Sequence, residues 1–169
     1  MGGIQADEGK KRLFVNKLDS SLGSLANCER LSLSTNMIEK LFPLSGMARL
    51  RILSLARNRI KRIEKLEDVA DTLEQLWLSY NEVSTLDGLA GLNNLEVLYL
   101  SNNQVRDWGE LAKLADLPKL REVLFVGNPI YDGLDVAQQR AMVVKYVPHI
   151  MKVDSQIITD ADRELAATL

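Results

Sequence analysis

The chain has 169 residues, of which 46% are hydrophobic and 26% charged, and this length and composition fit one globular domain. Its formal net charge of −2 argues against a nucleic-acid-binding surface. No apolar run reaches the length of a membrane span, and the first residues lack the apolar stretch of a secretory signal, so we expect no membrane partner either. Cys28 is the only cysteine, which excludes an internal disulfide and favours a reducing compartment such as the cytoplasm.

The chain begins with a segment of low apolar content. We expect residues 1–17 to form an N-terminal segment that is partly flexible. Leu18, Leu22 and Leu25 then continue the spacing of the repeats that follow, which predicts a partial first coil. The sequence therefore divides into this segment, a solenoid over residues 18–131 and a C-terminal cap over residues 132–169.

Five segments repeat the pattern apolar-x-x-apolar-x-apolar-x-x-Asn. They begin at Cys28, Leu50, Leu73, Leu95 and Leu120, at intervals of 22 to 25 residues. This period predicts leucine-rich repeats stacked into an α/β solenoid. The alternation within each unit predicts a short strand, so the strands should form a curved parallel β-sheet on the concave face. The wider apolar spacing after each Asn predicts short helices or 3₁₀ turns on the convex face, with a longer helix only in the fourth unit.

One asparagine closes each of these five segments: Asn36, Asn58, Asn81, Asn103 and Asn128. An amide side chain both donates and accepts hydrogen bonds, so it can satisfy backbone groups that a turn leaves unpaired. Because each Asn occupies the same bend of its coil, we interpret the row as structural and not as a polar binding site.

The cap begins with residues 134–146, which we predict to form a helix that ends before Pro148. Ile150 and Val153 then repeat the three-residue step that opens each unit. This step predicts a sixth, degenerate strand.

A terminal helix should follow. Thr159 and Asp162 have the spacing of a capping box, which predicts a helix start at this point. We expect Ile157 and Ile158 to pack this helix against the solenoid.

No catalytic constellation is visible in the sequence. His149 is the only histidine, and no second His or Cys stands at a zinc-ligand spacing from it. Phosphate-binding glycine motifs are absent from the sequence. We therefore predict a protein that is not an enzyme and has no metal or other cofactor.

The side chains that flank the strand leucines should line the concave face, and its centre is apolar. The candidate partner-binding residues are Ile52, Trp77, Val97, Tyr99, Leu124 and Val126. Exposed aromatic residues on a rigid sheet are good binding hot spots. In the alternative interpretation these side chains only pack on one another or lie under the terminal helix.

A run of basic residues lies between residues 49 and 65, and only Glu64 opposes it. Arg57, Arg59 and Arg62 are our candidates for electrostatic contact with an acidic protein surface. The alternative, which the sequence favours equally, is a solvated run of charges that keeps the protein soluble.

Several stretches are more specific than the general repeat. They are LSTNMIEK, LRILSLARN, ADTLEQLWLSYN and SNNQVRDWGE. Through them the chain resembles the leucine-rich-repeat light chains of axonemal outer-arm dynein, in one register over residues 18–165.

This resemblance implies a non-catalytic subunit that is a monomer in isolation and acts in the axoneme of a cilium or flagellum. Its partner would be a dynein heavy chain, bound at the motor region or the microtubule-binding tip of the stalk, with an effect on motility. The basic run or the terminal helix, through Arg163, would face tubulin. Related repeat proteins leave open a regulatory scaffold of a phosphatase or of a spliceosomal complex.

Overall fold

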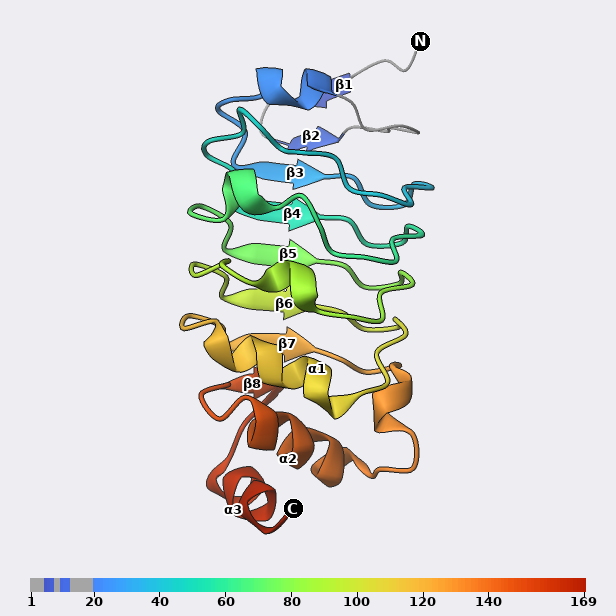
Figure 1. Cartoon of the computed structure of the whole chain (residues 1–169), viewed down its shortest axis with the longest axis vertical. Helices are drawn as coiled ribbons and strands as arrows, with labels where there is room; N and C mark the ends of the chain where they lie inside the picture. Colours follow the sequence, from blue (N-terminus) through green and yellow to red (C-terminus); the bar gives the residue numbers. More distant parts are fainter. Residues whose placement is uncertain (1–4, 8–9, 13–19) are drawn as a thin grey trace.

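The computed structural model describes residues 5–7, 10–12 and 20–169, and its core is one continuous sheet (Figure 1). The strands are β1 (Gln5–Asp7), β2 (Lys10–Arg12), β3 (Arg30–Ser32), β4 (Ile52–Ser54), β5 (Gln75–Trp77), β6 (Val97–Tyr99), β7 (Glu122–Leu124), β8 (Lys152–Val153) and β9 (Gln156–Ile157). They lie in sequence order; β2 to β8 pair in parallel, and the β1–β2 and β8–β9 pairs are antiparallel. The predicted solenoid with a parallel sheet is confirmed.

The register of the sheet places equivalent residues of successive coils side by side. Leu31, Leu53, Leu76, Leu98, Val123 and Val153 form one lateral row. All six are buried in the core. Because neighbouring strands are only about 4.8 Å apart, each row is a continuous apolar contact that a single repeat could not make alone.

The return legs are mostly irregular, and their helical segments are short and mainly 3₁₀. They contain η1 (Ser20–Ser24), η2 (Glu67–Val69), η3 (Asp87–Leu89), α1 (Trp108–Ala112), η4 (Lys113–Asp116) and η5 (Pro129–Tyr131). The longest of them, α1 followed by η4, belongs to the fourth unit, as its greater length predicts.

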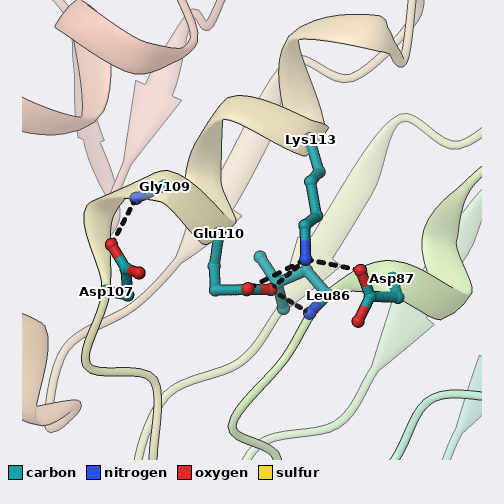
Figure 2. Close-up of polar contacts among 6 residues, drawn as sticks. All are labelled: Leu86, Asp87, Asp107, Gly109, Glu110 and Lys113. Atoms are coloured by element: carbon teal, nitrogen blue, oxygen red, sulfur yellow. Dashed lines mark hydrogen bonds and ion pairs between the residues drawn. The ribbon is translucent and has the colours of Figure 1, made fainter.

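Polar side chains join α1 to the return leg before it (Figure 2). The Glu110 carboxylate accepts hydrogen bonds from the Leu86 backbone N–H at 2.7 Å and from Lys113. Lys113 also forms an ion pair with Asp87 in the preceding coil. These hydrogen bonds raise the pKa of Lys113, so its amine stays charged and holds the two coils together.

The asparagines form a structural ladder, which confirms their predicted role. Asn81 Oδ1 accepts from the Ile60 N–H at 3.0 Å, and Asn81 Nδ2 donates to the carbonyls of Leu55 and Leu78. Asn58, Asn103 and Asn128 repeat this arrangement one coil apart. Each of these four amides therefore satisfies backbone groups of its own coil and of the coil before it, while Asn36 donates to the carbonyls of Leu33 and Ser34 in its own coil.

The residue before each Asn has a left-handed backbone. The φ values are 61° at Thr35, 57° at Arg57, 60° at Tyr80, 54° at Asn102 and 80° at Gly127. A Cβ at Gly127 would lie 2.5 Å from Asn102 Oδ1, so a side chain at this bend would displace the Asn102 amide. The bend turns the chain out of the sheet and directs the asparagine that follows it into the core.

The C-terminal cap contains helix α2 (Val136–Tyr146), whose predicted start at 134 is two residues early. Asp135 caps it by accepting from the Gln138 N–H at 2.9 Å. The sixth strand is β8, as predicted. In the turn that follows β8, the Asp154 carboxylate accepts from the N–H groups of Phe125 and Val126.

The terminal helix α3 spans Asp160–Thr168 and begins with the predicted capping box. The expected packing of Ile157 against the core is wrong, because Ile157 is 76% exposed. It pairs with Lys152 in the β8–β9 hairpin, and this register turns its neighbour Ile158 toward the core instead. Ile158 alone makes the expected apolar contact.

At the other end of the sheet, β1 and β2 extend it beyond the first repeat. They lie within the predicted flexible segment 1–17, whose other residues, like Leu18, fall outside the described residues. Leu22 is buried and Leu25 packs against the core, as expected of a partial coil. In the part of the chain that the structure describes, no helix has the length and apolar character needed to span a membrane.

Candidate protein-binding site

One face of the sheet points away from the core, and we call it the open face. Its first lateral row consists of Arg30, Ile52, Gln75, Val97, Glu122 and Lys152, and its second of Ser32, Ser54, Trp77, Tyr99 and Leu124. Because side chains alternate along a strand, these rows project opposite to the buried leucines. The register of the strands confirms the prediction that these strand residues share one face of the sheet.

Two aromatic side chains occupy the centre of the open face. The rings of Trp77 and Tyr99 are stacked, with centroids 5.8 Å apart and planes at 22°. Both side chains are partly exposed. Such a pair presents a large rigid apolar surface that loses little conformational entropy when a partner covers it.

The two rings differ in how their polar atoms are satisfied. The Tyr99 hydroxyl donates to Glu122 Oε1 at 2.8 Å. The Nε1–H of Trp77 is buried and has no acceptor among the described residues. An unpaired buried donor costs about 1–3 kcal/mol, a cost that Trp77 bears in this position and Tyr99 does not.

Glu122 connects the aromatic pair to the cap. The same Oε1 atom also accepts from the Lys152 amine of β8 at 3.1 Å. Burial, together with the hydrogen bond to Glu122, raises the pKa of Tyr99 to about 12. Tyr99 is therefore neutral at physiological pH, and its ring is held in a fixed orientation.

The other candidates on the open face differ in exposure. Ile52 and Leu124 are partly exposed, and Val126 is 49% exposed. Val97 is the exception, because only 5% of it is accessible. It lies between the longer side chains of Gln75 and Glu122 on the adjacent strands, so the expectation that Val97 is open to a partner is wrong.

Small polar residues flank the aromatic centre. Ser34 and Ser54 share a hydrogen bond of 2.6 Å between their hydroxyls, and Ser101 donates to Ser79 at 2.8 Å. These pairs satisfy one another and project little beyond the backbone. A partner could therefore approach the sheet closely beside the taller rings of Trp77 and Tyr99.

The predicted basic residues gather where the second coil leaves the sheet. We name Arg57, Arg59, Lys61 and Arg62 the basic edge. The Arg57 guanidinium lies over the Tyr80 ring, 4.4 Å from its centroid. Arg59 and Arg62 are exposed.

Arg163 lies apart from this group. Its guanidinium donates to the carbonyls of Pro148 and Ile150 at 2.7 and 3.0 Å. These bonds hold α3 against the segment that joins α2 to β8, so the exposed Arg163 side chain has a structural contact within the cap. Its contact with a partner stays a prediction.

Two contributors to these surfaces were not among the sequence candidates. Tyr80, which is 47% exposed, stacks with Arg57, and the Glu122–Lys152 pair borders the aromatic centre. The repeat period could have predicted both contacts. Tyr80 is the residue of the next coil that is equivalent to Arg57, and Lys152 in the sixth strand is the neighbour of Glu122.

The remaining polar candidates have structural environments. The His149 Nε2–H donates to the Leu117 carbonyl at 3.0 Å. The Cys28 side chain packs partly against the core, in agreement with a structural thiol. Within the described residues, no three or more His, Cys, Asp or Glu side chains form a group that could hold a metal ion.

Comparison with known proteins relates the chain to one set of curated relatives. A family model described as leucine-rich repeats in two copies matches residues 71–113. The chain is 56% identical over 151 residues to human dynein axonemal light chain 1, which covers 89% of this chain and 80% of that protein. It is 56% identical over 156 residues to dynein axonemal light chain 1 of Chlamydomonas reinhardtii, covering 90% and 79%.

Solved structures share the architecture at lower identity. An internalin from Listeria monocytogenes superposes with a TM-score of 0.61 at 24% identity, over 88% of this chain and 41% of that chain. A chain of the SNF/U2A' complex of Drosophila melanogaster gives a TM-score of 0.55 at 21% identity, over 99% and 85%. At these identities the likeness shows the leucine-rich-repeat fold alone.

Proposed function

Because the chain belongs to the family of axonemal dynein light chain 1, we propose that it is a non-catalytic subunit that binds a dynein heavy chain through its open face. A member of this family belongs in the axoneme of a cilium or flagellum. The observation that carries the proposal is the stacked pair of Trp77 and Tyr99 at the centre of an apolar sheet surface.

The shape and chemistry of the open face suit an α-helical segment. Trp77, Tyr99 and Leu124 lie side by side on adjacent strands and form an apolar strip across the sheet. An amphipathic helix presents a complementary apolar stripe of similar width. The neighbouring Glu122 and Lys152 supply a polar rim, as in typical protein interfaces.

The heavy-chain segment that we propose as the partner lies in the motor region, at the microtubule-binding tip of the stalk. Helices are the elements that a rigid apolar strip recognises best. Binding there would place the light chain beside the microtubule and so allow it to modulate motility. In the absence of the heavy chain we expect a monomer.

A reconstitution tests this proposal. The purified chain is mixed in turn with the tail, the motor ring and the stalk tip of an axonemal outer-arm heavy chain, and complexes are scored by size-exclusion chromatography. We expect a complex with the stalk tip, and cross-linking mass spectrometry should connect it to strands β4 to β7. If the chain forms no complex with any heavy-chain fragment, the proposal is wrong; a complex with the ring or tail alone refutes the stalk assignment.

A further inference from the structure

The basic edge lies outside the aromatic strip and has a chemistry of its own. Between residues 49 and 65 the chain carries seven basic residues and one acidic residue. Arg49 and Arg51 precede β4, and the four residues of the basic edge follow it, where the left-handed backbone at Arg57 turns the chain out of the sheet. The cations of the basic edge therefore lie at the rim of the solenoid and not on the open face.

The Arg57 side chain is already ordered. Its guanidinium stacks over the Tyr80 ring of the next coil at 4.4 Å. Stacking uses the flat face of the guanidinium and leaves its N–H groups directed outward at the edge. A ligand carboxylate could accept hydrogen bonds from these N–H groups. The Arg57 side chain would then lose little conformational entropy on binding.

The other two arginines of the basic edge lack a counter-charge. Among the residues whose side chains the structure describes, no carboxylate forms an ion pair with Arg59 or Arg62, and the only ion pair of the basic edge joins Lys61 to Glu82 at 3.7 Å. Elsewhere in the solenoid, Arg51 and Arg121 are bound to Glu74 and Glu96. Arg59 and Arg62 therefore carry charges that no described carboxylate pairs with.

We propose that the basic edge binds an acidic, extended polypeptide segment, with its carboxylates on Arg57, Arg59 and Arg62. The acidic residues Glu64 and Glu82 lie at the border of the cluster and would repel a continuous polyphosphate chain. A peptide can place carboxylates at the arginines and neutral residues opposite the glutamates. The exposed Tyr80 ring offers an apolar surface for one of those neutral side chains.

The test uses a fluorescein-labelled oligoglutamate peptide and fluorescence anisotropy with the full chain. We expect binding at about 20 mM salt that weakens steadily toward about 200 mM, as for screened charges. Arg59→Glu combined with Arg62→Glu should weaken binding at least about tenfold. Lys119→Glu combined with Lys145→Glu is the matched control, since both lysines are exposed, lack a carboxylate partner among the described residues and give the same change in net charge.

Three results would overturn the inference. They are an equal loss in both double variants, no binding of the peptide at low salt, and tighter binding of a single-stranded oligonucleotide than of the peptide. The variant with Trp77→Ala and Tyr99→Ala should bind the peptide like the wild type. Peptide binding by the basic edge is therefore tested independently of heavy-chain binding by the open face.

Discussion

The Tyr99 hydroxyl donates to Glu122 across the β6–β7 pair at 2.8 Å, and Glu122 accepts from Lys152 in the next strand. One carboxylate thus joins the aromatic centre of the open face to the first strand of the cap. Its loss should loosen the orientation of the Tyr99 ring while the leucine core beneath it stays packed.

The burial of Tyr99, together with its hydrogen bond to Glu122, predicts that stability depends on alkaline pH. The pKa of Tyr99 is raised to about 12 from an ordinary value of 10.0, so the folded state keeps a proton that the unfolded state releases. The stability due to this group is complete below pH 10 and is lost as the pH rises toward 12. Urea unfolding midpoints between pH 9 and about 11.5 should fall less steeply for Tyr99→Phe than for the wild type. Identical slopes would contradict the assignment.

The asparagine ladder predicts a large loss of stability from a single substitution. Asn81→Ala removes the acceptor of the Ile60 N–H and the donor to Leu55 and Leu78 in one step. Because these backbone groups stay buried, we expect the free energy of unfolding to fall by at least about 2 kcal/mol. Asn93→Ala, at an exposed position, is the control and should change it by less than about 0.5 kcal/mol. Equal effects would show that the ladder is not a source of stability.

The terminal helix depends on one buried carboxylate. Asp162 accepts from the Arg140 guanidinium of α2 at 2.9 Å and from the N–H and hydroxyl of Thr159. Burial raises the pKa of Asp162, but the hydrogen bonds from Thr159 and the ion pair with Arg140 outweigh burial and lower it. Its stabilising contribution is present above the ordinary pKa of 3.8 and is lost as the pH falls below that value.

Asp162→Ala should therefore release α3 locally. We expect amide hydrogen exchange over residues 160–168 to become at least about tenfold faster, while β4 to β7 stay protected. Asp160→Ala is the control for the lost charge, because Asp160 is exposed and lies two residues earlier, in the same first turn of α3. Uniformly faster exchange across the solenoid would mean that the cap and the repeats unfold as one unit.

Much of this architecture follows from the sequence because a repeat constrains every coil in the same way. The position of Asn81 in its unit was enough to predict its buried, turn-stabilising role. The capping box of Thr159 and Asp162 was visible for a similar reason, since its hydrogen bonds are local. Short-range chemistry and a fixed period are the two signals that a single sequence carries well.

The features that the sequence did not predict depend on lateral neighbours. Val97 is buried by the side chains of Gln75 and Glu122 on the two adjacent strands, which its own repeat does not reveal. Arg163 donates to the carbonyls of Pro148 and Ile150, which its own segment of sequence does not reveal. The stacking of Arg57 on Tyr80 likewise joins two coils through their bends.

The most direct test measures the affinity of the chain for the isolated stalk tip of the heavy chain by isothermal titration calorimetry. Substituting alanine for both Trp77 and Tyr99 should raise Kd at least about thirtyfold, as expected when the hot spot of an interface is removed. Circular dichroism should show an intact fold, and the pair Met37→Ala and Val136→Ala, at exposed apolar positions off the open face, should bind normally. An unchanged Kd in the Trp77 and Tyr99 variant would contradict the claim that the open face holds the heavy chain.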